Sequence, residues 1–354
     1  MKSVVVVGAG VVGLFCAVRL AQAGARVTLL EAETEDRSVY GPGASAAAAG
    51  MLAPLGERGS AHDKLALASF DLWREWQPGA EWADAVRFDG GVAVCADELE
   101  AQALLARALA LGRKAETLSA GRVRKLTGLR SKLEHAVFIE EEGVCEPVRM
   151  LSGLAMRAIA HGVIIDYDAD VHTIESGVVR AHDGGVHKAD AIVVAPGAWA
   201  TESLKRTAPA LNLVRAGKGH LVPVALPETL GPNVRAREFY LAQRRNDVVL
   251  GATVEMDRTD RRVEQARIDE LLAAADALLP GEVQPAGRGW AGIRPMSPDG
   301  WPLIGPSGDA LVAAGHSRNG WLLAPITAEI ITAYVFGAEI PSEWAALSPQ
   351  RFMS

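Results

Sequence analysis

Arg294 is a candidate for holding a negatively charged group. It stands in the stretch GWAGIRPMSPDGWPLIG, Gly289 to Gly305, between a short apolar run and a proline-rich turn. A guanidinium grips a carboxylate through two parallel hydrogen bonds, which fix both position and orientation. The residues alone leave two partners open. The carboxylate could belong to the protein, as a structural salt bridge, or to a ligand.

A glycine pattern near the N-terminus suggests nucleotide chemistry. The β-branched run at residues 3–7 predicts a buried parallel strand, 11–23 a helix, and 26–31 a second strand. The sequence GAGVVG, Gly8 to Gly13, lies between the first strand and the helix. A GxGxxG pattern is weak by itself, but within such a strand–helix–strand unit it predicts a dinucleotide site.

Each residue of this pattern has a physical task. Gly8 permits the tight turn, Gly10 lets the backbone approach a pyrophosphate, and Gly13 lets helix and strand pack closely. The helix N-terminus attracts phosphate. Glu31 would accept hydrogen bonds from ribose hydroxyls and would repel a 2′-phosphate, which disfavours NADP. The alternative is a glycine-rich turn with no ligand.

Two further stretches favour FAD over NAD. The small residues of SAAAAGMLAP, Ser45 to Pro54, would let the backbone approach a flat ring, although a mobile loop is the alternative. In LVAAGHSRNGWLLAPITAEIITAYV a strand ends at Gly315, a loop follows and a helix begins. The N-terminal dipole of that helix would stabilise negative charge on a reduced flavin. An ordinary strand–helix crossover would look similar.

Composition bounds the class of protein. The chain has 354 residues, 49% of them hydrophobic, and a net charge of −7, which argues against non-specific nucleic-acid binding. Its cysteines, Cys16, Cys95 and Cys145, include no CxxC pair, so we expect reduced thiols in a cytoplasmic protein. Glycines interrupt the apolar N-terminus and Arg19 ends it, so we expect neither a signal peptide nor a membrane span.

The order of elements predicts the architecture. Helices and parallel strands are expected at the start, middle and end of the chain, with β-rich segments between them. We therefore expect an α/β fold: a discontinuous Rossmann-like FAD-binding domain with an inserted antiparallel-sheet α+β substrate domain. The predicted boundaries are 1–85, 145–210 and 285–354 for the first, and 86–144 and 211–284 for the second.

Taken together, these segments resemble the glycine oxidase branch of the D-amino-acid-oxidase-like FAD-dependent amine oxidoreductases. The resemblance runs from about residue 3 to residue 340. It rests on VVVVGAGVVGLFCAVRLAQAGARVTLLE, SAAAAGMLAP, VVAPGAW, VLGATVE, WAGIRPMSPDGWPLIG and AAGHSRNGWLLAPITAEII. The last two are the most specific.

The resemblance implies positions for the cofactor. Val11 and Val12 would line the pyrophosphate turn, Glu31 and Ala32 the ribose, and the Val171 backbone the adenine. The flavin would be approached by Ser45, Ala49, Gly50 and Met51, by Gly197, and by the loop His316, Ser317, Arg318, Asn319, Gly320, Trp321 and Leu322. Relatives that attach flavin covalently use a cysteine near the C-terminal region. None follows Cys145, so non-covalent FAD is expected.

The resemblance also implies the chemistry. Arg294 would bind the substrate carboxylate, Tyr240 would give it a second hydrogen bond, and Arg318 would lie on the substrate side of the flavin. Hydride would pass from the α-carbon to flavin N5, giving an imine, and dioxygen would reoxidise the flavin to yield hydrogen peroxide. Glycine, sarcosine or a small D-amino acid is the expected substrate, and self-association stays open.

Two positions depart from the family pattern. Glu238 stands where some relatives carry histidine, and Val254 where a methionine can line the pocket, so glycine itself is in doubt. Trp301 is expected to pack rather than to line the pocket, and His316 to pack in the flavin loop rather than act as a base. Two other functions stay open: a dehydrogenase that uses another electron acceptor, and a module that binds FAD without catalysis.

Overall fold

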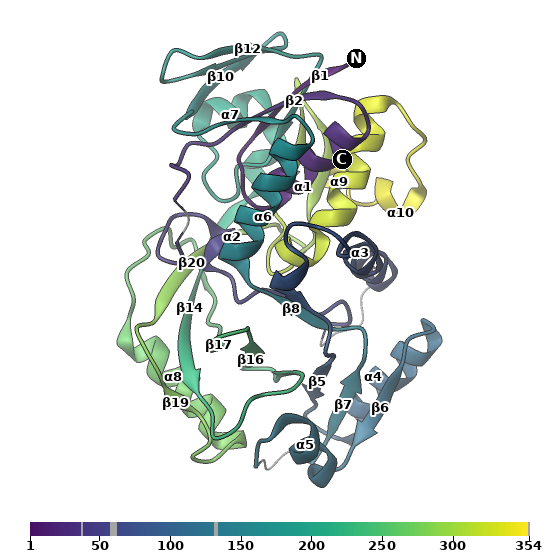
Figure 1. Cartoon of the computed structure of the whole chain (residues 1–354), viewed down its shortest axis with the longest axis vertical. Coiled ribbons are helices and arrows are strands. Elements are labelled where there is room, and N and C mark those ends of the chain that lie inside the picture. The colour runs from purple at the N-terminus through teal and green to yellow at the C-terminus, as the bar shows by residue number, and fades with distance from the viewer. Residues whose placement is uncertain (37, 57–61, 131–133, 353–354) are drawn as a thin grey trace.

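The chain folds around two large β-sheets, one above the other in Figure 1. The computed structural model describes residues 1–36, 38–56, 62–130 and 134–352. Both termini lie at the upper end of the molecule, beside the smaller of the two sheets. Within the described residues, no helix is both long and apolar enough to cross a membrane.

The upper sheet has six strands in the order β21-β22-β13-β1-β2-β9. Its pairs are parallel except for β21 with β22, which form an antiparallel edge. β1 is buried in all but its first residue, as expected for a valine-rich strand covered on both faces. The strands are β1 Ser3–Val7, β2 Arg26–Leu30, β9 Ile164–Asp166, β13 Ala191–Val194, β21 Leu303–Ser307 and β22 Ala310–Ala314.

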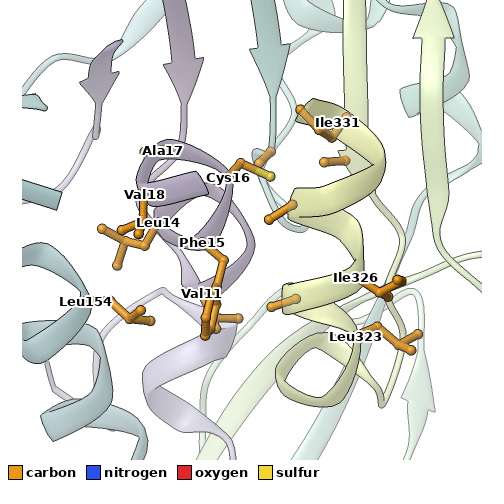
Figure 2. Close-up of a cluster of buried hydrophobic side chains, with 14 of the residues drawn as sticks. Val11, Leu14, Phe15, Cys16, Ala17, Val18, Leu154, Leu323, Ile326 and Ile331 are labelled. Atoms are coloured by element: carbon orange, nitrogen blue, oxygen red, sulfur yellow. The ribbon is translucent and has the colours of Figure 1, made fainter. Parts of the chain in front are cut away.

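Helix α1, Val11–Gln22, lies between two other helices on one face of this sheet (Figure 2). Leu14 and Val18 point toward Leu154 of α6, Pro147–Ala160, while Cys16 points toward α9, Gly320–Phe336. Because α9 is apolar on nearly all sides, it is a core helix rather than a surface one. Burying α1 and α9 together fixes the two helix N-termini that begin next to the cavity described below.

The lower sheet has ten strands, with β18-β14-β17-β16-β15-β5-β7-β6 in line. β19 and β20 also pair with the long strand β14. All pairs are antiparallel except β15 with β5. The strands are β5 Gly91–Val94, β6 Ala115–Leu118, β7 Ala136–Ile139, β14 Arg215–Ala225, β15 Asn233–Arg235, β16 Tyr240–Gln243, β17 Val248–Gly251, β18 Glu255–Met256, β19 Gln284–Pro285 and β20 Trp290–Met296.

Smaller elements complete the fold. One three-stranded sheet joins β3 Met51–Leu52, β8 Gly143–Cys145 and β4 Val86–Arg87, and another joins β10 Val171–Glu175, β11 Val178–Ala181 and β12 Val186–Lys188. The remaining α-helices of the described residues are α2 Ala44–Ala47, α3 Asp63–Trp76, α4 Glu98–Ala110, α5 Ala120–Thr127, α7 Glu202–Thr207, α8 Gln265–Leu278 and α10 Ser342–Ala345.

The predicted α/β architecture is confirmed, including the opening strand–helix–strand unit. One segment lies elsewhere than the sequence indicated. The prediction groups 285–354 with the nucleotide-binding part, but β20 pairs with β14 along Arg215–Leu221, in the lower sheet. Short-range patterns could not reveal this pairing, because the two strands are far apart in the chain. The consequence is that Arg294 belongs to the lower sheet.

Candidate active site

A cavity of about 1190 Å³ is lined by residues of both large sheets. Val7 of β1, Tyr240 of β16 and Arg294 of β20 all contribute to its wall. The sequence-predicted site residues in this wall are Gly8, Gly10, Val11, Val12, Glu31, Ala32, Ser45, Ala49, Gly50, Met51, Val171, Gly197, Tyr240, Arg294, His316, Ser317, Arg318, Asn319, Gly320 and Trp321.

Two predicted residues, both described by the structure, do not line the cavity. The Leu322 side chain is buried in the core with α1, because it lies in the first turn of α9 and points inward. Gly13 lies beneath the turn: a Cβ there would stand 1.8 Å from the Gly8 carbonyl oxygen. Gly13 therefore permits close packing, as the pattern predicted, without touching the cavity.

The turn between β1 and α1 leaves no room for side chains. Gly8 has a φ of +98°, and an added Cβ would lie 2.4 Å from the Ala195 carbonyl oxygen. At Gly10 an added Cβ would lie 3.2 Å from the Ser45 hydroxyl. That hydroxyl accepts a hydrogen bond from the Val11 N–H at 3.0 Å. Ser45, expected at the flavin, thus also borders the predicted pyrophosphate turn.

Glu31 is held in place at the end of β2. One carboxylate oxygen accepts from the Ala9 N–H at 2.6 Å and the other from the Glu33 N–H at 3.2 Å. The side chain still lines the cavity. Each carboxylate oxygen has more than one acceptor position, so hydrogen-bonding capacity remains for a ligand hydroxyl.

The Arg294 side chain crosses β14 at Gly219, where there is no side chain beneath it. A Cβ on Gly219 of β14 would lie 2.1 Å from the Arg294 Nη1. That nitrogen donates to the Thr253 carbonyl oxygen at 3.0 Å. Among the described residues, no carboxylate lies within 4.0 Å of this guanidinium. By contrast Arg235, also in the wall, pairs at 2.9 Å with the buried Glu142.

Tyr240 places its hydroxyl beside Arg294. Gly251 lies next to the ring, where an added Cβ would be 2.6 Å from the hydroxyl oxygen. Burial raises the pKa of Tyr240, and the nearby charges of Arg294 and Arg318 oppose that rise. Burial lowers the pKa of Arg294, and the like charge of Arg318 lowers it further. Two cations and a phenol therefore gather at one end of the cavity.

Arg318 and His316 belong to the loop before α9 but differ in environment. Arg318 is exposed and, within the described part of the chain, has no carboxylate within 4.0 Å. His316 is buried, and its Nε2 lies 3.0 Å from the Thr327 hydroxyl. Because that hydroxyl donates to the Leu323 carbonyl at 2.7 Å, it accepts from the histidine. Burial lowers the pKa of His316 to about 3.

Glu238 lies in a turn rather than in a strand. Arg237 and Glu238 join β15 to β16, and the turn is closed by a hydrogen bond from the Ala236 N–H to the Phe239 carbonyl at 2.8 Å. Both tip residues are exposed and border the cavity. Trp301 is not among the lining residues that the structure describes and stacks on His62, with ring centroids 4.4 Å apart.

Comparison with known proteins identifies the family. The family model described as FAD dependent oxidoreductase matches residues 3–334, nearly the whole chain. This chain belongs to the FAD-dependent oxidoreductase family. A glycine oxidase of Bacillus licheniformis is 30% identical over 96% of this chain and 94% of its own length. A glycine oxidase of Pseudomonas aeruginosa is 31% identical over 96% of each chain.

A solved structure agrees with the family assignment. The glycine oxidase of Geobacillus kaustophilus superposes with a TM-score of 0.84 at 28% identity, covering 99% of each chain. The expected resemblance to the glycine oxidase branch is thus confirmed, and the protein is an FAD-dependent oxidoreductase of the glycine oxidase type.

The cavity fits the cofactor of an FAD-dependent oxidoreductase. The α1 N-terminus borders the cavity and Gly10 carries no Cβ there, so this turn can receive a pyrophosphate. Glu31 lies at the end of β2, where a ribose is bound in dinucleotide folds. The cavity volume exceeds the roughly 300–1,000 Å³ typical of pockets for drug-sized ligands, so a dinucleotide and a small substrate have room.

Sequence reasoning missed the residues that make room for Arg294 and Tyr240. Gly219 and Gly251 contact these side chains from neighbouring strands, and Thr253 supplies the carbonyl that orients Arg294. Gly219 belongs to GKGH, Gly217 to His220, a regular alternation of glycines with a lysine and a histidine. That alternation is a readable sign that one strand face is kept empty.

Proposed function

We propose that this FAD-dependent oxidoreductase oxidises a small amino acid at its α-carbon. Glycine, sarcosine or a D-amino acid would be the substrate, and dioxygen the electron acceptor. The amine is oxidised to an imine, which water hydrolyses to an oxo acid and ammonia, or to an oxo acid and methylamine for sarcosine. The two electrons removed from the amine reduce dioxygen to hydrogen peroxide. The observation that supports this most is Arg294, a guanidinium in the cavity with no carboxylate within 4.0 Å among the described residues.

Arg294 would receive the substrate carboxylate. One of its N–H groups is already given to Thr253 and the Tyr240 hydroxyl also contacts the guanidinium, which has five N–H donors and so keeps donors for a carboxylate. The Tyr240 hydroxyl would add a hydrogen bond to the same carboxylate. Because burial raises its pKa, Tyr240 stays protonated and acts as a donor at neutral pH. Two donors on one carboxylate fix the direction of the α-carbon, which is the main requirement for reaction.

The cofactor would be held by the residues of the upper sheet. The α1 N-terminus and Gly10 would take the pyrophosphate, Glu31 the ribose, and the loop from His316 to Trp321 would border the ring, with FAD held non-covalently. When bound, FAD supplies the two-electron acceptor for the amine oxidation. The buried His316 is neutral and already bonded to Thr327, so it would pack this loop rather than remove a proton.

An amino-acid panel tests the proposal. The purified holoenzyme is mixed anaerobically with glycine, sarcosine, D-alanine or L-alanine, and flavin bleaching is followed in a stopped-flow instrument. We expect rapid bleaching by at least one of the first three, and peroxide formation when air is admitted. Bleaching without peroxide, but with turnover on an artificial acceptor, would instead make the protein a dehydrogenase. No bleaching by any amino acid would contradict the proposal.

A further inference from the structure

The segment Gly217–His220 presents two different faces beside Arg294. Gly219 lies under the guanidinium and lines the cavity. Since alternate residues of a strand point to opposite faces, Lys218 and His220 point away from the cavity. Both are 0% exposed. Burying a lysine and a histidine completely is costly unless each has hydrogen-bond partners, so the back face must hold a polar network.

Thr253 connects that network to the cavity. Its carbonyl oxygen accepts from the Arg294 Nη1 at 3.0 Å. Its hydroxyl accepts from the His220 backbone N–H at 3.0 Å and lies 3.1 Å from the His220 Nδ1. The residue that orients the guanidinium is therefore itself fixed twice by one histidine.

The far side of the imidazole is fixed as well. The His220 Nε2 accepts from the Glu264 backbone N–H at 3.1 Å. A neutral ring that accepts at Nε2 carries its proton on Nδ1, so Nδ1 donates to the Thr253 hydroxyl. Burial, followed by the charge of Lys218, lowers the pKa of His220, which favours this neutral form. The Glu255 carboxylate lies 3.3 Å from the same Nδ1.

Ion pairs brace the segment that carries Glu264. Lys218 Nζ lies 2.8 Å from Asp260 and 3.3 Å from Glu264. Arg258 contacts the same two carboxylates at 2.8 and 2.7 Å. A continuous series of hydrogen bonds and ion pairs therefore runs from the 258–264 segment through His220 and Thr253 to Arg294.

We propose that Thr253 and His220 are positioning residues for Arg294. They hold its guanidinium with one N–H group turned to the Thr253 carbonyl and the rest turned toward the substrate carboxylate. This inference rests on the proposed function, in which Arg294 binds that carboxylate. A cluster that only stabilised the fold would leave substrate affinity unchanged when its hydrogen bonds to Thr253 were removed.

Thr253→Val in the holoenzyme tests the inference. Valine keeps the shape and the carbonyl but removes the hydroxyl that His220 holds. We expect the dissociation constant for acetate, titrated against flavin absorbance, and the KM for the best amino acid to rise about tenfold, with kcat changed less than about twofold. Thr253→Ser should restore both values. His220→Gln, which removes the ring that joins Thr253 to the Glu264 N–H, should shift them in the same direction.

Thr127→Val is the matched control. The Thr127 hydroxyl is also buried and bonded on both sides, to the Val123 carbonyl at 2.8 Å and from the Leu129 N–H at 3.2 Å, but it lies in α5 outside this network. Loss of the Thr127 hydroxyl should leave acetate binding unchanged. If Thr253→Val and His220→Gln also leave acetate binding unchanged while Arg294→Ala weakens it, the positioning role is wrong and the proposed function stands.

A double variant distinguishes the positioning role of Thr253 from the binding role of Arg294. In the Arg294→Ala background, Thr253→Val should weaken acetate binding no further, because nothing is left to position. A full additional loss there would overturn the positioning role. If Arg294→Ala alone left acetate binding unchanged, both the inference and the proposed role of Arg294 would be wrong.

Discussion

Gly219 lies directly beneath Arg294, and a Cβ added to it would stand 2.1 Å from the Arg294 Nη1. The two residues are 75 positions apart in the chain, and the antiparallel pairing of β14 with β20 brings them together. The guanidinium can lie at the cavity wall because Gly219 has no side chain at this point of β14.

Gly219→Ala should displace that guanidinium. The methyl group and Nη1 cannot share the space, and Arg294 is held at both its strand and Thr253, so its terminal group must turn away. We expect KM to rise about tenfold or more with FAD still bound, by analogy with the roughly 1–3 kcal/mol cost of overpacking. Gly121→Ala in α5 is the control, since nothing lies within 4 Å of its added Cβ. Steady-state kinetics at equal flavin content would show the difference; equal KM values in both variants would contradict the packing argument.

Gly10→Val should lower FAD occupancy. The N-terminus of α1 is open to a pyrophosphate because Gly10 has no side chain, and its Cβ position already lies 3.2 Å from the Ser45 hydroxyl. A branched side chain would fill the space that the phosphates need and press on that hydroxyl. The ratio of flavin to protein absorbance in the purified protein measures the effect. A fully loaded variant would show that the backbone and the pyrophosphate do not approach closely here.

Much of the proposed cofactor side of the cavity was predictable from the sequence, because the residues that form it lie close together in the chain. The glycines between residues 8 and 13 and the acid at Glu31 lie within one strand–helix–strand unit, and the structure places all but Gly13 in the cavity wall. The wall around Arg294 and Tyr240, which we propose as the substrate side, depends instead on the pairing of strands. Gly219 and Arg294 are 75 positions apart, so no short window of sequence contains both. Gly251 and Tyr240 are closer in the chain, but they become neighbours only when β16 pairs with β17.

The position of Glu238 illustrates a second limit. Glu238 stands two residues before Tyr240, and in a regular strand the two side chains would share one face. A hydrogen bond from the Ala236 N–H to the Phe239 carbonyl closes a turn there instead. The turn residues are Arg237 and Glu238, neither of which has the strong turn preference of glycine, asparagine or proline. The tertiary pairing of β15 with β16 overrides the local pattern, and Glu238 reaches the cavity mouth from the turn.

His316 should make the stability of the protein depend on pH. Its folded pKa of about 3 lies below the value of about 6.5 for an unfolded histidine, so between these values the unfolded chain binds the extra proton. The contribution of His316 is therefore complete above the unfolded value and declines as the pH falls. Between pH 7 and pH 5 the loss from this group is about 2 kcal/mol. Denaturant titrations of His316→Gln should show a correspondingly smaller drop in unfolding free energy over that interval. An equal drop in both proteins would mean that the buried ring is not kept neutral.

The proposed function depends above all on Arg294, which would bind the carboxylate of an amino acid. The most direct test is the KM of Arg294→Ala, measured with the best substrate of the panel and with flavin content checked first. Removing a charge-assisted partner from a buried carboxylate costs roughly 2–5 kcal/mol, which corresponds to a rise in KM of about 30-fold or more. Arg237→Ala, which removes an exposed cation at the cavity mouth, should change KM only about twofold. We expect Arg294→Ala to retain its flavin and to bind the substrate poorly. An unchanged KM in the flavin-loaded variant would show that Arg294 does not hold the substrate carboxylate.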